Sequence, residues 1–337
     1  AQAPAALGAA AGKKRARAAA KSPEPKAPRR SSRRRLGPPE PPLEGDHSKV
    51  LRHRGDATWE RVPLESYKPP QNRSWDGVKR NELVGKRGES TAFHLRYFEV
   101  APGGYTTFEK HQHEHVVFNV RGEGEVQMGG EVWATEPGDV VYTSPGLPHQ
   151  FRCPEGASAP YGFLCIVNAR RDRPVELDPG DFDQRPGRPT AAAGNVGKIL
   201  PYLGDGRWRG LEGVAFPDRE GSHQGVSKCE LVGTRGETPE FHMRYFEVAP
   251  GGFTPFERHA HPLCLYVMKG EGEAQMGPKI TKVRKGDVVY FGPNDPHQLR
   301  HAEGSPDSLG FICWVPARRG AATPVDPADL FSGTACH

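Results

Sequence analysis

Short apolar stretches alternate with glycine and proline turns along most of this chain. Phe93–Val100 and Phe241–Val248 are rich in aromatic and β-branched residues, and each leads into Pro-Gly-Gly, which is typical of a strand that ends in a turn. Further strands are predicted at Val116–Val120, Val126–Met128, Val140–Thr143 and Gly162–Val167. Many short strands separated by turns are typical of an antiparallel barrel or sandwich, so we expect an all-β fold.

The whole pattern occurs twice. Residues Glu82–Arg171 return as Glu230–Arg319 at a constant offset of 148 residues, without a gap, and about half of the aligned positions are identical. A repeat of this length is a duplicated domain rather than a short solenoid unit. We therefore expect two barrels of one kind, in which differences between the copies indicate properties that one copy has lost.

The expected organisation has five parts. These are an Ala-, Pro-, Lys- and Arg-rich tail at 1–45, a first barrel at 46–175, a linker and lead-in at 176–225, a second barrel at 226–325 and a short C-terminal tail at 326–337. Within the linker, Asn195–Tyr202 is expected to form a short helical piece. A chain of 337 residues is long enough for two such domains, each with its own core.

Positive charge is concentrated in the N-terminal tail. Residues 1–44 contain eleven Lys or Arg and three Glu, a net charge of +8, so the remaining residues carry −3. The tail has few apolar residues to bury and is expected to be disordered. In the simplest interpretation its basic residues 13–35 are solvated. Contact with nucleic acid or another acidic partner, nuclear import and organelle targeting are alternatives for this segment alone.

Composition narrows the class of protein further. No apolar run approaches the ~20 residues that span a bilayer, so we expect a soluble protein without a membrane partner. Six cysteines do not form a dense disulfide framework, and we interpret them as reduced thiols of an intracellular protein, most simply a cytoplasmic one. The oligomeric state stays open, with a homo-oligomer as one alternative.

Both copies contain Glu-x-His-x-His, followed later by Gly-Asp-Val-Val-Tyr and Pro-His-Gln. Alternate side chains of a strand share a face, so Glu109 and His111 point the same way, and His149 adds an imidazole at the start of a later strand. Burying such groups together is unfavourable unless they share a metal ion or tight hydrogen bonds. Imidazole and carboxylate suit iron, manganese, nickel, copper or zinc, and residue type does not distinguish among these divalent metals.

The spacing of these residues resembles the two sequence motifs of the cupin superfamily. The positions that carry the resemblance are Gly103, Glu109, His111, His115, Gly122, Gly138, Pro145, Gly146 and His149 in the first copy, and Gly251, Glu257, His259, Gly270, Gly286 and His297 in the second. The resemblance implies a bicupin, with two tandem double-stranded β-helix (jelly-roll) barrels like those of oxalate decarboxylases and quercetin dioxygenases. Cupins include enzymes, storage proteins and sensors, so the fold alone does not fix an activity.

The first copy departs from the ligand set that the resemblance implies, which is His-x-His, then Glu, then a distant His. Glu109 stands at the first His position and His115 at the Glu position, so three His and one Glu are kept in permuted order. The expected site for one divalent transition metal is therefore Glu109, His111, His115 and His149. A competing register pairs His111 with His113 and shortens the following loop by two residues.

The same alignment gives Glu257, His259, Leu263 and His297 in the second copy. Leucine cannot bind a metal ion, so we expect the second barrel to be a degenerate site. His301, four residues after His297 and on the same strand face, is an alternative replacement ligand.

Three classes of function are compatible with these patterns. We favour a metal-dependent enzyme of the dioxygenase or decarboxylase kind that acts on a small organic molecule through the first barrel, with Glu109 as a ligand or a general base. The second class is a non-catalytic small-ligand-binding protein or sensor, and the third is a structural or interaction protein that works through its basic tail. Arg96 and Arg244 are candidates for binding an anionic substrate, with structural salt bridges as the alternative.

Overall fold

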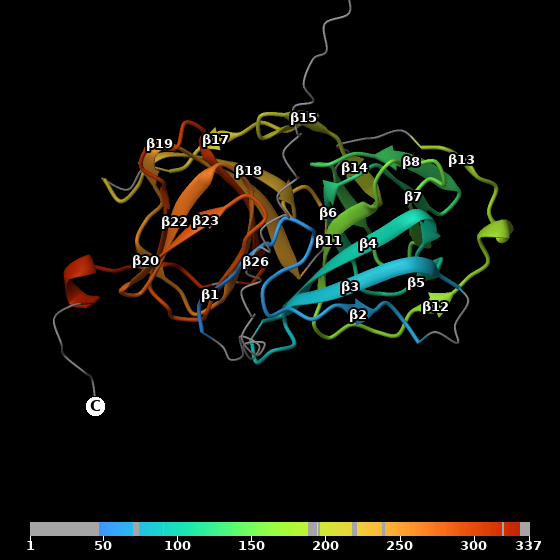
Figure 1. Cartoon of the computed structure of the whole chain (residues 1–337), viewed down its shortest axis with the longest axis horizontal. Coiled ribbons are helices and arrows are strands. Elements are labelled where there is room, and N and C mark those ends of the chain that lie inside the picture. The colour runs from blue at the N-terminus through green and yellow to red at the C-terminus, as the bar shows by residue number, and fades with distance from the viewer. Residues whose placement is uncertain are drawn as a thin grey trace, which may run out of the picture. The chain divides into compact units, whose positions relative to one another are not determined.

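The computed structural model describes residues 47–69, 74–89, 91–187, 194, 196–217, 221–237, 240–318 and 320–330. The expected tail at 1–45 and the last residues of the expected C-terminal tail lie outside these ranges. Within them, regular structure is almost entirely β, which confirms the predicted all-β class (Figure 1). No helix in this part of the chain has the length and apolar character needed to cross a membrane.

The first barrel is formed by a thirteen-stranded sheet. Its strands are β2 (Glu65–Ser66), β3 (Asp76–Val84), β4 (Phe93–Tyr105), β5 (Glu109–Lys110), β6 (His115–Arg121), β7 (Gly124–Met128), β8 (Glu131–Thr135), β9 (Val140–Thr143), β10 (His149–Arg152), β11 (Tyr161–Asn168), β12 (Val175–Glu176), β13 (Arg185–Pro186) and β14 (Lys198–Leu200). The central order is β7-β10-β4-β11-β6-β9, so strands that are distant in the chain become neighbours. This interleaving brings the starts of β6 and β10 into the same interior.

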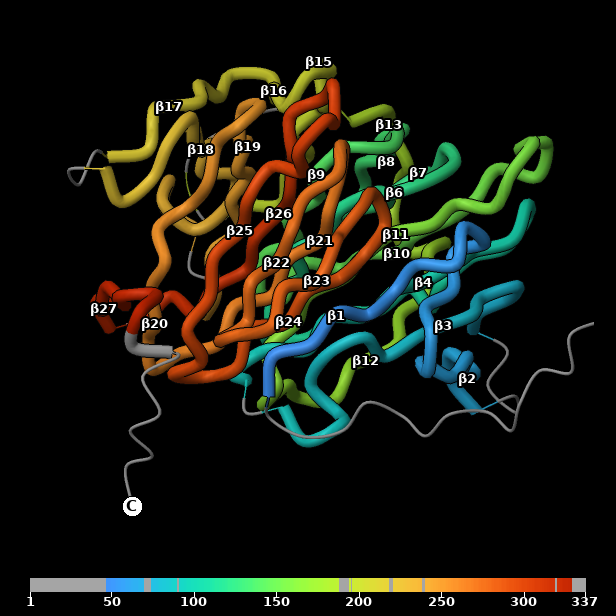
Figure 2. The backbone as a smooth tube through the Cα atoms, turned by 60° about the vertical axis from the view of Figure 1, so that its left-hand side comes forward, coloured from blue at the N-terminus to red at the C-terminus, as the bar shows by residue number. Residues whose placement is uncertain are grey.

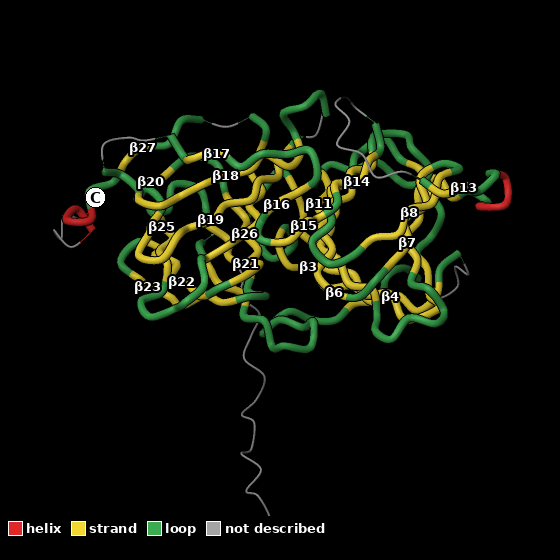
Figure 3. The backbone as a smooth tube through the Cα atoms, turned by 90° about the horizontal axis from the view of Figure 1, so that it is seen from above, coloured by secondary structure: helices red, strands yellow, loops and turns green. Residues whose placement is uncertain are grey.

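The second barrel is formed by a twelve-stranded sheet. Its strands are β1 (Lys49–Leu51), β17 (Val214–Ala215), β18 (Gln224–Val232), β19 (Phe241–Phe253), β20 (Glu257–Arg258), β21 (Leu263–Lys269), β22 (Glu271–Met276), β23 (Lys279–Arg284), β24 (Val288–Phe291), β25 (His297–His301), β26 (Leu309–Pro316) and β27 (Thr323–Pro324). A ribbon of β15 (Tyr202–Gly204) and β16 (Arg207–Trp208) completes the described strands, and two 3-10 helices, η1 (Pro179–Asp181) and η2 (Pro327–Leu330), appear as the short red turns of Figure 3.

The strands β11 and β26 are buried along their whole length because each faces two cores. In β11, Phe163 and Cys165 point into the first barrel, whereas Leu164 and Ile166 join a cluster that lies between the barrels. The same alternation recurs in β26. Burial on both faces explains why these strands are continuous apolar runs and lack the apolar–polar alternation of a half-exposed strand.

The two barrels exchange strands. We call residues 49–59 arm 1 and residues 198–208 arm 2. Strand β1 of arm 1, which precedes the first barrel, pairs with β24 of the second (Figure 2). Strand β14 of arm 2, which precedes the second barrel, pairs with β9 of the first. A tryptophan of each arm reinforces the pairing, since Trp59 Nε1 donates to the Gly286 carbonyl and Trp208 Nε1 to the Gly138 carbonyl, both at 2.9 Å. Neither barrel's sheet is therefore complete without the other copy.

A buried ion pair fastens each arm to the barrel that follows it in sequence. Lys49 Nζ lies 2.9 Å from Oε1 of Glu89, and Lys198 Nζ lies 2.7 Å from Oε1 of Glu237. The Lys198 and Glu237 side chains are both 0% exposed. Burial opposes ionisation of Glu237, but Lys198 and the backbone N–H of Arg235 outweigh it and hold the pKa of the carboxyl below its ordinary 4.5. Each lysine therefore sits on one barrel's sheet and binds a carboxylate of the other barrel.

The expected helical piece at Asn195–Tyr202 is not found in the described residues 196–202. Lys198–Leu200 instead forms β14, with all three residues buried. Pairing with β9 supplies the backbone hydrogen bonds that a helix would make internally, so tertiary pairing overrides local preference. The exchange also crosses the expected domain limits, because β1 lies within 46–175 and β14 within the expected linker at 176–225.

Removing one lysine of these pairs is expected to destabilise the whole chain. Lys198→Met leaves the Glu237 carboxylate buried without its ammonium partner, a change that typically costs about 3 kcal/mol of unfolding free energy. Lys269→Met, which breaks the partly exposed pair with Glu247, should cost less than about 1 kcal/mol.

Urea unfolding at pH 7 measures both losses. Adding Glu237→Gln to Lys198→Met should restore most of the stability, since an amide oxygen still accepts from the N–H groups of Gly233 and Arg235. The contribution of the wild-type pair should disappear as the pH falls through the lowered pKa of Glu237. Equal losses for Lys198→Met and Lys269→Met would contradict the description of the exchange.

Candidate functional site

Three histidines converge inside the first barrel. His115 and His149 are the first residues of β6 and β10, and His111 follows β5, whose Glu109 pairs with His149. The ring centroid of His111 lies 4.5 Å from that of His115 and 4.8 Å from that of His149, and the centroids of His115 and His149 are 4.9 Å apart. One nitrogen of each ring lies within 4.8 Å of one nitrogen of the other two. Two strand starts and the loop after β5 therefore place three buried imidazoles around one point.

The hydrogen bonds of these rings leave nitrogen lone pairs facing one another. Nδ1 of His111 lies 2.7 Å from the His113 carbonyl oxygen, and Nδ1 of His149 lies 2.9 Å from that of Leu147. A carbonyl only accepts, so both Nδ1 atoms carry the proton and both Nε2 atoms carry a lone pair. Nε2 of His111 and Nδ1 of His115 are buried without a hydrogen-bond partner in the described part of the chain. Such acceptors are unfavourable unless an ion or a donor meets them, so these residues fit a metal ion.

The electrostatic environment keeps the three rings neutral. Burial lowers the pKa of His111 to about 3, and the nearby His149 acts in the same direction. Burial also holds the pKa of His115 well below its ordinary value, with His111 as the next cause. The pKa of His149 is lowered by burial as well, against the opposing effect of its bond to Leu147. A neutral imidazole is the form that binds metals.

His113 lies beside this cluster and has a carboxylate partner. Its ring stacks on His111 with centroids 3.6 Å apart, and its Nδ1 lies 2.6 Å from Oδ1 of Asp172. Asp172 also accepts from the backbone N–H groups of Gln112 and His113, so it fixes the loop between β5 and β6. His111, His113 and Asp172 form a second group of possible ligands, which corresponds to the competing register. Sequence reasoning missed Asp172, although the second copy has Gly320 at that position.

Glu109 is adjacent to the three histidines but is bonded elsewhere. Its Oε2 lies 2.6 Å from Lys68 Nζ, which also donates to Thr107 Oγ1 at 2.9 Å. Glu109 therefore does not join the cluster of ligand atoms formed by the histidines. Lys68 precedes the repeated segment, and sequence reasoning gave no role to it.

Arg96 supplies a buried positive charge to the same interior. A cavity of about 180 Å³ is lined by Arg96, Glu109 and all four histidines of the two groups. Arg96 is 9% exposed, its Nε has no hydrogen-bond partner in the described residues, and its Nη2 meets only the thiol of Cys165, at 3.5 Å. The guanidinium also lies over the ring of Phe98. A buried guanidinium without a carboxylate partner favours an anionic ligand.

The second barrel places its corresponding residues differently. The ring centroids of His259 and His297 are 4.7 Å apart, and Leu263 occupies the position of His115. Among the described residues of this barrel, no three potential metal ligands lie close together. Phe291 stacks on His297 with centroids 4.4 Å apart. His301 is engaged elsewhere, because its Nε2 donates to the Asp307 carbonyl and its Nδ1 accepts from the N–H of Gly251.

The described structure is therefore a duplicated β-barrel whose two copies exchange strands. The histidine cluster of the first barrel is its candidate metal site. A family model described as Cupin domain matches residues 96–167 and 244–313, one stretch in each barrel. The chain belongs to the cupin family, and the two-barrel arrangement expected from its motifs is confirmed.

Individual relatives differ in activity. The 1-methylthio-D-xylulose 5-phosphate methylsulfurylase of Rhodospirillum rubrum is 44% identical over 117 residues, which cover 34% of this chain and 72% of the relative. The structure of salicylate 1,2-dioxygenase from Pseudaminobacter salicylatoxidans is similar with a TM-score of 0.57 at 15% identity, covering 74% of this chain and 78% of that one. Oxalate decarboxylase from Lactobacillus farciminis gives a TM-score of 0.52 at 12% identity, covering 80% and 94%. At these identities the two structures share the fold with this chain.

Alanine substitutions distinguish the two registers. His115→Ala is expected to lower metal affinity about 10-fold or more, because it removes one of three converging nitrogens. His113→Ala should leave metal affinity nearly unchanged, since the His113 ring is bonded to Asp172. Competitive titration of Mn(II) and Zn(II) against a chelating indicator measures both. The reverse pattern would establish His111 and His113 as the ligand pair.

Proposed function

We propose that the protein is a metal-dependent enzyme whose first barrel binds one divalent transition-metal ion through His111, His115 and His149 and acts on a small organic anion. The observation that carries the proposal is the convergence of three neutral imidazoles, in which Nε2 of His111 and Nδ1 of His115 are buried without a partner among the described residues. Three imidazoles suit iron, manganese, nickel, copper and zinc, so the donor set leaves the metal open among these. A bound metal ion would act as a Lewis acid toward a substrate oxygen.

Arg96 supports the anionic character of the substrate. Its guanidinium faces the cavity without a carboxylate partner in the described residues, whereas the equivalent Arg244 is bonded to Glu230 at 2.9 Å. The Rhodospirillum rubrum relative is named for 1-methylthio-D-xylulose 5-phosphate, a molecule with an ionised phosphate. A phosphate or carboxylate group would replace the missing counter-charge of Arg96 and hold the substrate in a defined orientation.

Glu109 is the residue we propose as the proton acceptor. It is 8% exposed and stands on β5 directly opposite His149 of β10. The bond from Lys68 fixes its Oε2, so the other oxygen is the one available to a substrate proton. A positioned carboxylate of this kind is an effective general base when it lies within hydrogen-bond distance of the proton that it removes.

Loss of the Arg96 charge is expected to weaken substrate binding without removing the metal. In metal-loaded Arg96→Met protein, affinity for 1-methylthio-D-xylulose 5-phosphate, used as a probe, should fall at least about 10-fold, because one charge-assisted contact is lost. Arg244→Met, the matched change in the second barrel, should leave this affinity unchanged. Calorimetric titration with the probe and with inorganic phosphate measures both variants, while elemental analysis follows the metal.

Product analysis by mass spectrometry separates the enzyme from the ligand-binding alternative. Conversion of the probe by wild-type protein and its loss in Glu109→Gln would support catalysis. Arg96-dependent binding without any conversion would favour a sensor for this class of anion. Unchanged affinity for both probes in Arg96→Met would contradict the proposed substrate class.

A further inference from the structure

The second barrel contains a cavity of about 390 Å³, more than twice the volume of the cavity in the first barrel. Its lining has lost polar groups at the end that corresponds to the metal site. The exchanged positions are Leu263 for His115, Phe291 for Thr143, Pro255 for Thr107 and Gly320 for Asp172. The first three changes remove a buried polar side chain, and the fourth removes the exposed carboxylate that holds His113 in the first barrel. We call the second cavity the chamber, and these changes make this end of it more apolar than the metal site of the first barrel.

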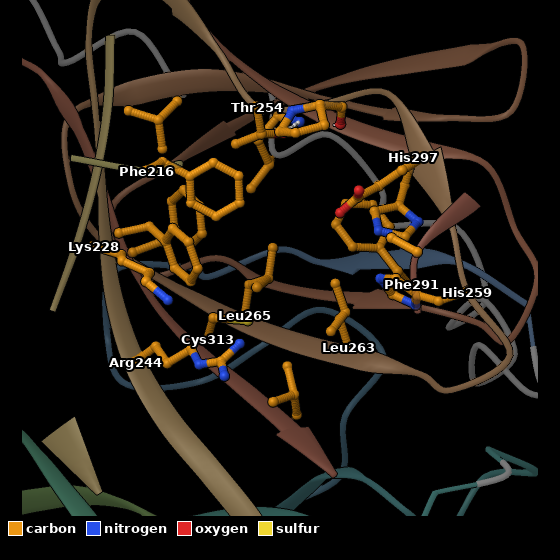
Figure 4. A pocket seen from close by; sticks show the side chains of 18 of the residues that line it. Phe216, Lys228, Arg244, Thr254, His259, Leu263, Leu265, Phe291, His297 and Cys313 are labelled. Carbon is orange, nitrogen blue, oxygen red and sulfur yellow. Dashed lines mark hydrogen bonds between the residues drawn. The ribbon is translucent and has the colours of Figure 1, made fainter. Parts of the chain in front are cut away.

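The two cations of this lining share one carboxylate of the protein. Lys228 Nζ lies 3.1 Å from Oε1 of Glu230, and Arg244 Nε lies 2.9 Å from Oε2 of the same carboxylate. Figure 4 shows Lys228 and Arg244 on one side of the cavity and His259 and His297 on the other. Arg244 is therefore bonded to a carboxylate, whereas Arg96 has no carboxylate partner in the described residues, so the second cavity lacks the unpaired guanidinium that favours an anion in the first barrel.

The histidine side of the chamber presents hydrogen-bond acceptors. Nδ1 of His297 donates to the Asp295 carbonyl at 2.8 Å, so its Nε2 carries a lone pair, and this atom is buried without a partner among the described residues. His259 has the same arrangement, with Nδ1 2.8 Å from the His261 carbonyl. Glu257, which pairs with His297 across β20 and β25, adds a carboxylate to this side of the lining. A buried acceptor of this kind favours a ligand that donates a hydrogen bond.

The rest of the lining includes aromatic and aliphatic side chains. The rings of Phe246 and Phe311 are stacked with centroids 5.4 Å apart, and Phe216 lies 6.0 Å from Phe246. Leu263 and Leu265 also line the cavity and lie between Arg244 and His259 in Figure 4. A volume of this size lies within the range that holds a small organic molecule, and its surface favours flat apolar groups.

We propose that the second barrel is a metal-free binding site for a neutral, mostly aromatic molecule with one hydroxyl group, which donates to Nε2 of His297 while the ring lies against Phe246 and Phe311. This site is separate from the proposed catalytic site and does not depend on it. The duplicated chain then combines one metal-dependent barrel with one barrel that binds an organic ligand of different chemistry.

The test compares three probes of similar shape with the metal-loaded full chain, by isothermal titration calorimetry at pH 7. The probes are 4-ethylphenol, which is a neutral donor, ethylbenzene, which has no donor, and 4-ethylbenzoate, which is an anion. We expect 4-ethylphenol to bind at one site per chain, and the other two to bind at least about 10-fold more weakly, the difference made by one hydrogen bond to a buried acceptor. No binding of 4-ethylphenol, or binding of ethylbenzene with equal affinity, would overturn the proposal. Tighter binding of 4-ethylbenzoate would identify an anion site instead.

Matched variants locate the probe. His297→Leu should reduce 4-ethylphenol affinity to that of ethylbenzene, whereas His149→Leu, the same change in the first barrel, should lower metal content and leave 4-ethylphenol affinity unchanged. The opposite pattern would place the probe in the first barrel and overturn the assignment. If His297→Leu fails to fold, as judged by circular dichroism, Leu265→Met and Val117→Met provide a milder pair, of which only the first should alter 4-ethylphenol affinity. Binding of a second Mn(II) ion that is lost in His259→Ala would also contradict a metal-free barrel.

Discussion

The two barrels are held together by the exchange of strands β1 and β14, and the other features of the structure follow from this exchange. Each exchanged strand is stabilised by a buried ion pair, Lys49–Glu89 or Lys198–Glu237. In the first barrel, two successive strand pairings connect the exchanged strand β14 to the histidine site. Lys198 of β14 pairs with Tyr142 of β9, and the next residue, Thr143, pairs with His115. The strand that carries one of the three converging histidines is therefore held in register by a segment that belongs, in sequence, to the lead-in of the other copy.

The second barrel has the same series of strand pairings, from β1 through β24 to β21. Lys49 pairs with Tyr290 of β24, and the following Phe291 pairs with Leu263. These two residues are apolar where the first barrel has Thr143 and His115, although the strands, the exchange and the buried ion pair are retained. The scaffold does not depend on the polarity of these interior positions, so the two copies can differ in interior chemistry, and only the first has the three converging histidines and the unpaired guanidinium of Arg96 among the described residues.

Much of the fold and part of the candidate site could be predicted from the sequence. Short apolar runs between glycine and proline turns indicated strands, and the strict repeat indicated two barrels. The motif spacing predicted four ligands, Glu109, His111, His115 and His149, and the structure brings together nitrogens of the three histidines while Glu109 is bonded to Lys68. These features are local or periodic, so they are visible in a single sequence.

The remaining features depend on contacts between distant residues. The segment around Lys198 was expected to be helical but forms a strand. Its burial comes from pairing with the other barrel, which no local pattern reveals. Asp172 and Lys68 act through His113 and Glu109, which are 59 and 41 positions away in the chain, so no local pattern indicates their roles. Whether Arg96 is paired could be decided only once the neighbours of its guanidinium were known.

The central claim is that the two copies differ in metal binding because only the first brings three imidazole nitrogens together. X-ray diffraction from crystals of metal-loaded protein, recorded on both sides of the absorption edge of the bound metal, tests this claim most directly. We predict one anomalous peak per chain, in the first barrel and in contact with His111, His115 and His149. Peaks of equal height in both barrels, or the absence of a peak between these three residues, would contradict it.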